Sequence, residues 1–113
     1  MKHLTFADKS LLVGDVAADL LVEYAAALGN ANQADTVSLH AFGADGDEVE
    51  ATMVINQGTA LMVESTHTSL SEPDNEDAIE QMRRGLILLS SPARALVEEE
   101  AGEGESPVNQ FDL

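Results

Sequence analysis

The spacing of apolar residues changes twice along this chain, and that change limits the folds it can adopt. Apolar residues recur at helical spacing over 16–28, alternate with polar residues over 36–66, and return to helical spacing over 73–90. A period near 3.6 indicates an amphipathic helix, and a period of two indicates a strand with one buried face. We therefore expect two helices and an antiparallel sheet.

The first predicted helix covers residues 16–28, and one of its faces is apolar. We expect Asp15 to cap its first turn and Gly29-Asn30 to supply a left-handed stop. The residues on the apolar face are Ala17, Leu20, Leu21, Tyr24 and Leu28.

The second predicted helix covers residues 73–90, where Pro73 and Asp74 suit a first turn. Its apolar residues are Ile79, Met82, Leu86 and Leu89. Because these residues share one face, this helix should also pack against the sheet.

Three strands are predicted over residues 36–42, 48–55 and 60–66, separated by turns at Asp45-Gly46 and Asn56-Gln57-Gly58. Short connections favour antiparallel neighbours, so the three strands are expected to form a meander. At the start of the chain, Leu4–Phe6 and Leu11–Val13 flank polar residues. A hairpin is the preferred interpretation there, and a single helical turn is the alternative.

These elements predict an α+β fold of order β-β-α-β-β-β-α, a two-layer sandwich with both helices on one face of an antiparallel sheet. Residues 1–92 would form the single domain. Residues 93–113, rich in Glu, Gly and Pro, would form a disordered acidic tail, since too little apolar surface remains to offset the entropy of ordering.

Cysteine is absent from the 113 residues, which excludes disulfides, thiolate metal sites and cysteine nucleophiles. No run of about 18 apolar residues indicates a membrane span, and the N-terminus does not resemble a signal peptide. With few Lys and many Ala, Asp and Glu, the composition suits a bacterial cytoplasmic protein. We expect that localisation and no membrane association.

The net charge is −16, from 21 acids and five bases. Residues 1–91 contain 15 of the acids and four of the bases, a net of −11. Such a surface repels nucleic-acid phosphates and anionic lipids. It favours either simple solubility or binding to a basic protein partner.

Catalytic and metal sites are not indicated. His3, His40 and His67 belong to different strands, and parity places His40 outward but His67 inward. The acidic turn around Asp45 and Asp47 lacks the spacing of a calcium loop. Hydroxyl residues around His67 lack an identifiable third catalytic group. We expect no enzyme activity, cofactor or metal.

Apolar residues at two surface locations are candidates for partner binding. Phe42, Val54 and Met62 interrupt the polar outer face of the sheet. The tail ends in Gln110, Phe111, Asp112 and Leu113, and an apolar pair at the tip of an acidic tail can anchor a segment that folds on a partner.

These last four residues resemble the short clamp-binding peptides of bacterial replication proteins, which run Gln, an aliphatic residue, Asp or Ser, Leu, then Phe. Phe111 stands where Leu is usual, and the final Phe is missing. The resemblance covers four residues and implies nothing about the other 109.

The expected function is that of a small acidic protein–protein interaction or regulatory module without catalytic activity, binding a protein partner or a second copy as a homodimer. Two alternatives remain open: an acidic mimic that blocks a basic nucleic-acid-binding surface, and a small-ligand binder or small enzyme.

Overall fold

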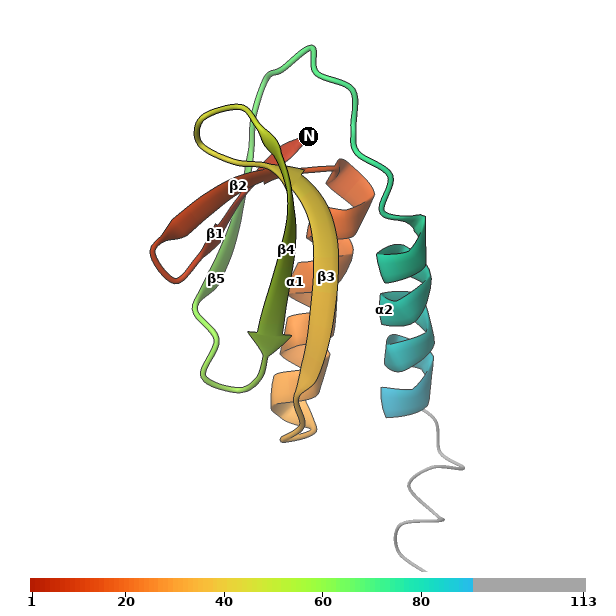
Figure 1. Ribbon diagram of the computed structural model, residues 1–113. Helices are drawn as coiled ribbons and strands as arrows, with labels where there is room; N and C mark the ends of the chain where they lie inside the picture. Colours follow the sequence, from red (N-terminus) through yellow and green to blue (C-terminus); the bar gives the residue numbers. More distant parts are fainter. Residues whose placement is uncertain (91–113) are drawn as a thin grey trace, which may run out of the picture.

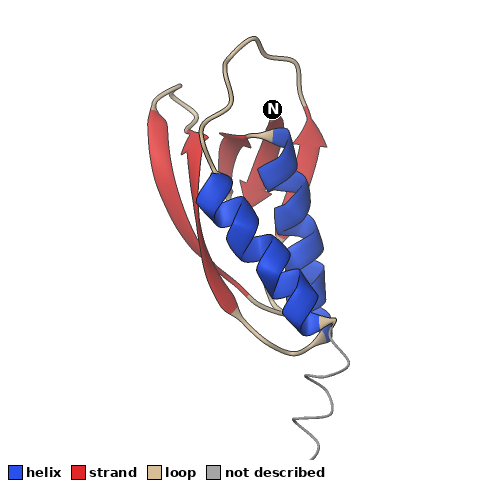
Figure 2. Ribbon diagram, turned by 90° about the vertical axis from the view of Figure 1, so that its right-hand side faces the viewer, coloured by secondary structure: helices blue, strands red, loops and turns tan. Residues whose placement is uncertain are grey.

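A computed structural model of the chain describes residues 1–90. It has the predicted order of elements: β1 Lys2–Phe6, β2 Lys9–Val13, α1 Asp15–Asn30, β3 Asp35–Phe42, β4 Glu48–Ile55, β5 Leu61–Ser65 and α2 Glu76–Leu89. The five strands form one antiparallel sheet, and the two helices lie side by side on one face of it (Figures 1 and 2). The predicted α+β sandwich is confirmed.

The predicted meander of the last three strands is wrong. The strand order is β4-β3-β2-β1-β5, so β5 pairs with β1 at the opposite edge of the sheet from β4. The N-terminal segment is the preferred hairpin, with Phe6 opposite Lys9 and Ala7 in a left-handed conformation at φ 57°. That hairpin occupies the place beside β5 that the meander would have given to β4.

A short connection still links the two edges because the sheet is strongly curled. Only residues 56–60 separate β4 from β5. Four of these residues form a tight turn, in which Thr59 N–H donates to the Asn56 carbonyl at 3.2 Å. Four strand spacings of a flat sheet would be about 19 Å, too far for this turn. The sheet therefore bends until the ends of β4 and β5 approach, as Figure 1 shows.

The bend lies between β2 and β3, which pair only at Leu12 and Phe42. Away from the Leu12–Phe42 pair, side chains of α2 and of its N-cap residue form hydrogen bonds with backbone groups at the edge of β3. Asn75 accepts the His40 N–H at 2.6 Å and donates to the His40 carbonyl at 2.8 Å, and Gln81 donates to the Thr36 carbonyl at 2.9 Å. Helix α2 thus replaces a neighbouring strand along part of β3.

The core lies between the helices and the concave face of the sheet. Both helices turn the faces predicted for them toward the core. Leu21 and Met82 are at 0% exposure. Four other predicted residues are half-buried against the core: Leu20, Ile79, Leu86 and Leu89. Alternate apolar residues of β3, which the period of two predicts to share the buried face, are at 0% exposure: Val37, Leu39 and Ala41. The buried core consists of Leu4, Val13, Ala17, Ala18, Leu21, Tyr24, Leu28, Val37, Leu39, Ala41, Met53, Ile55, Ala78 and Met82.

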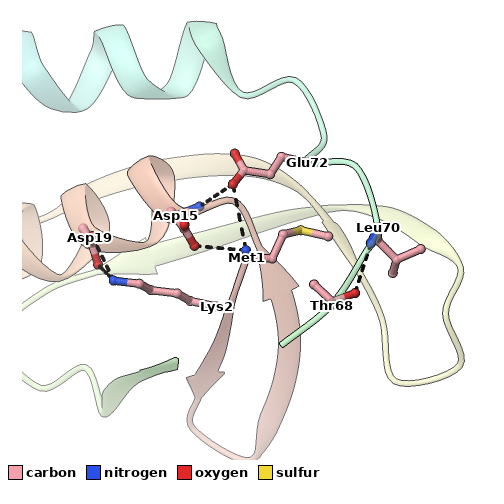
Figure 3. A network of polar contacts seen from close by, with 7 residues as sticks. All are labelled: Met1, Lys2, Asp15, Asp19, Thr68, Leu70 and Glu72. Carbon is pink, nitrogen blue, oxygen red and sulfur yellow. Dashed lines mark hydrogen bonds and ion pairs between the residues drawn. The ribbon is translucent and has the colours of Figure 1, made fainter. Parts of the chain in front are cut away.

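The ends of α1 differ from the predicted caps. Gly14 is the N-cap residue, and the Asp15 side chain makes no cap hydrogen bond. Instead, Glu72 accepts the Asp15 N–H at 3.3 Å, while the Asp15 carboxylate lies 3.0 Å from the Met1 amino group (Figure 3). At the other end, Asn32 (φ 58°) takes the left-handed conformation expected of Gly29-Asn30. Asparagine tolerates this region well, so the helix continues two residues further.

Two further expectations need correction. Helix α2 begins at Glu76 rather than at Pro73, because Asn75 is its N-cap and turns its side chain toward β3. His67 is exposed rather than inward, because β5 ends at Ser65 and strand parity stops there. The predicted domain boundary at residue 92 and the tail 93–113 lie outside the described residues.

Candidate functional site: a cleft beside the free edge of β4

Strand β4 is the outermost strand on its side of the sheet, and the helices leave part of its inner face open. Helix α1 packs on β1 and β5, while α2 packs on β3. Of the inward residues of β4, Met53 and Ile55 are buried but Val49 is 37% exposed. The open part of β4 faces a cleft.

The cleft has a volume of about 970 Å³ and lies between β4, the β1–β2 hairpin and the β3–β4 turn. Its apolar walls are the inward side chains of the hairpin on one side and of β4 on the other. Its lining residues are Phe6, Asp8, Lys9, Ser10, Leu11, Gly43, Ala44, Asp45, Val49, Ala51, Thr52, Met53 and Val54. A volume near the upper end of the range for ligand pockets can hold several side chains of a bound segment.

Backbone groups of β4 point toward the open side. The His40 N–H and carbonyl bond to Asn75, so they face away from β4. His40 is opposite Glu50, and in such an antiparallel pair both residues direct their backbone groups outward. By alternation, Thr52 and Val54 do the same, and both line the cleft. Backbone groups of β4 that have no partner within residues 1–90 therefore lie next to an apolar surface.

Acidic side chains surround this end of β4. The two turns at the mouth of the cleft and the first residues of β4 contain five acids and one base: Asp8, Lys9, Asp45, Asp47, Glu48 and Glu50. Glu48 and Glu50 are exposed on the outer side of β4. Lys9 forms no ion pair within residues 1–90, although the other lysine of this part, Lys2, pairs with Asp19 at 2.7 Å. The electrostatic potential at the cleft is therefore negative.

A polar network lies at the start of β3, on the other side of the two-stranded ribbon that β3 and β4 form (the β3–β4 ribbon). The Tyr24 hydroxyl of α1 donates a hydrogen bond to the Asp35 carboxylate, and Gln81 of α2 donates to the same oxygen at 3.2 Å. Burial of the phenol, together with the Asp35 carboxylate, raises the pKa of Tyr24 to about 12. These contacts tie both helices to the start of β3.

The sheet residues proposed from sequence do not form one patch. Phe42 and Val54 lie at opposite ends of the β3–β4 ribbon, opposite Glu48 and Thr36 respectively. Met62 lies on β5, opposite Thr5, at the other edge of the sheet. Only Val54 lines the cleft. The tail residues Gln110, Phe111, Asp112 and Leu113 lie outside the described residues.

The histidines remain apart from one another. His40 is exposed on the outer face, as parity predicted, and His3 Nδ1 lies 3.4 Å from Ser10 Oγ on the outer side of the hairpin. Within residues 1–90, His3 makes no hydrogen bond to a carboxylate, so the Ser-His contact lacks a group to orient the base. In the same part of the chain, no cluster of three or more His, Asp or Glu side chains could hold a metal ion.

The other cleft residues were not indicated by the sequence pattern. Phe6, Leu11, Val49 and Ala51 are apolar residues of the predicted strands, and nothing in their spacing set them apart as cleft residues. The sequence held no local signal for the cleft, because the order of the strands decides which of their apolar side chains face one another.

Neither helix described in residues 1–90 has the length and apolar character needed to cross a membrane. No protein-family model, no curated protein and no solved structure matches this chain.

Proposed function

We propose that this protein is a non-catalytic interaction module that binds an extended segment of a partner protein along the free edge of β4. The partner segment adds a sixth strand to the sheet, and its alternate side chains enter the cleft. Main-chain hydrogen bonds supply affinity in this mode of recognition, and the cleft supplies specificity.

The observation that supports the proposal most directly is the position of the cleft. Thr52 and Val54 belong both to its lining and to the set of residues whose backbone groups face outward. An exposed strand edge next to apolar side chains is a typical template for strand addition. Val54 is 55% exposed and Val49 is 37% exposed, so a bound segment would remove apolar surface from water.

The test uses the full chain as target for a displayed library of random twelve-residue peptides. We expect enriched peptides that bind with the amides of Glu50 and Thr52 becoming protected from hydrogen exchange. The Thr52→Pro variant removes one outward N–H and keeps the backbone ladder to β3, because Thr52 and Ser38 exchange no backbone hydrogen bond. It also removes the side-chain hydrogen bond between Ser38 Oγ and Thr52 Oγ1 at 2.8 Å. Its peptide affinity should fall by about tenfold or more, from a lost hydrogen bond and the bulk of the ring.

The matched control is Ser65→Pro on the free edge of β5. Ala7 N–H donates to the Ala60 carbonyl at 3.0 Å, so alternation directs Ser65 away from β1. This variant should bind peptides as the unmodified chain does. If Ser65→Pro weakens binding and Thr52→Pro does not, or if no peptide is enriched above background on the folded protein, the proposal is wrong.

A second candidate function is binding of a small apolar ligand with an anionic group. Its support is Lys9, which lines the apolar cleft and makes no ion pair within residues 1–90. A thermal-shift screen with medium-chain fatty acids separates the candidates. A rise in Tm that Lys9→Gln removes, without protection of the β4 amides, favours the small ligand.

A further inference from the structure

We propose that the segment added to β4 is basic at one end, with Lys or Arg at alternate positions facing Glu48 and Glu50 and aliphatic residues between them facing the cleft. This inference rests on the proposed function and names the chemistry of the partner.

The alternation follows from the two faces of β4. Val49, Ala51 and Met53 point to the concave side, where they line the cleft together with Phe6 and Leu11. A strand added beside β4 continues the pleat, so its side chains alternate between the same two sides. Every second residue of the partner would therefore be apolar and enter the cleft.

The residues on the outer side of β4 determine which partner residues fit at the remaining positions, those that do not enter the cleft. Glu48 and Glu50 occupy its first half, while Thr52 and Val54 occupy its second half. Opposite charges in neighbouring strands are favourable, and like charges are unfavourable. Basic residues therefore suit the half nearest the acidic β3–β4 turn, and uncharged residues suit the other half.

Charge also argues against the other occupants. A second copy would bring a net charge of −16 to a cleft whose surroundings are already acidic. The chain's own residues 91–113 contain six acids and one base, since 21 − 15 = 6 and 5 − 4 = 1. Acidic residues on an edge strand also oppose pairing between copies of the same protein. A basic partner segment would instead be attracted by the acidic residues that repel these other occupants.

The experiment measures affinity for two synthetic peptides, Lys-Val-Lys-Val-Thr-Val-Ser-Val and its analogue with Glu in place of both Lys. At low ionic strength the basic peptide should bind about fivefold more tightly or better, from two partly exposed charge pairs. The preference should shrink at 0.5 M salt, where the charges are screened. In the double variant Glu48→Gln, Glu50→Gln it should disappear.

The control variant, Glu23→Gln with Glu64→Gln, makes the same change in net charge on α1 and on β5, at the opposite edge of the sheet, and should leave the preference intact. Equal affinity for both peptides, abolished by Thr52→Pro, would overturn the inference while the proposed function stands. Binding of neither peptide would overturn the inference, whereas a library screen that enriches no peptide would contradict the proposed function as well. Sedimentation of a dimer that Thr52→Pro dissociates would identify a second copy as the occupant and would also overturn the inference.

Discussion

The two edges of the β3–β4 ribbon differ in whether side chains of the protein itself bond their backbone groups. Along β3, the side chains of Asn75 and Gln81 from α2 bond to strand backbone groups at 2.6–2.9 Å. Along β4, the outward backbone groups of Thr52 and Val54 lie beside a cleft, and Glu48 and Glu50 are exposed on the outer side of the same strand. We call the β3 edge closed, because side chains of the protein itself bond it. We call the β4 edge open, because within residues 1–90 only acidic side chains oppose its pairing with another strand.

Together with the proposed function, this difference predicts that stability and binding depend on different edges of one ribbon. The closed edge is continuous with the buried core and with the Tyr24–Asp35–Gln81 network. The open edge contributes few buried side chains, so substitutions there should alter binding with little effect on folding. The predictions below measure that separation.

The largest effect is expected at Gly85, on the closed side. A methyl group there would lie 2.6 Å from the Tyr24 Cε1 and Oη atoms, so Gly85→Ala should destabilise the protein by about 2 kcal/mol despite its better helix propensity. At Gly29 of α1, the nearest atom is Gln57 Cα at 3.9 Å, and Gly29→Ala should instead stabilise by about 0.5–1 kcal/mol. Urea denaturation measures both, and equal signs would contradict the packing described.

The next largest loss of stability is expected for Asn75→Ala, because this substitution leaves the His40 N–H and carbonyl without their partner. The expected loss is about 1–3 kcal/mol in the free energy of unfolding. Hydrogen exchange at the His40 amide should accelerate more than at Leu39, whose backbone groups face β4. If the two amides respond alike, the substitution loosens the whole ribbon and α2 does not specifically close this edge.

A smaller effect, confined to alkaline pH, is expected from Tyr24. Its pKa is raised to about 12 in the folded protein and is about 10 when unfolded, so the phenol loses its proton more readily in the unfolded state. The stabilising contribution is complete below pH 10 and is lost as the pH rises toward 12. Tyr24 is the only tyrosine and tryptophan is absent, so tyrosinate absorbance reports this group alone. A folded-state midpoint near 10 would contradict the prediction.

The smallest effect on stability is expected at Val54, on the open side. Val54→Ser should change the free energy of unfolding by about 0.5 kcal/mol or less, because the side chain is 55% exposed. The same variant should weaken peptide binding measurably, since Val54 lines the cleft. A loss of stability comparable with that of Asn75→Ala would mean that the two edges are not energetically distinct.

Local patterns predicted every helix and strand of residues 1–90, because each needs only a periodic apolar face. They also predicted the inward sets on β3 and on both helices. Hydrogen bonds between residues far apart in the sequence could not be predicted from local patterns. Glu72 bonds the first residue of α1 from 57 positions away, and Asn75 bonds His40 from 35 positions away. An amide or carboxylate in a polar loop gives no local sign of such a partner.

The sequence by itself therefore determined the elements, their order, their buried faces and the acidity of the surface. Only the tertiary structure decided which strands are neighbours, since β5 pairs with β1 rather than with β4. The physical reason is that the hydrophobic pattern specifies which face of a strand is buried but not which strand lies beside it. The bend between β2 and β3 then created the cleft and left the edge of β4 open.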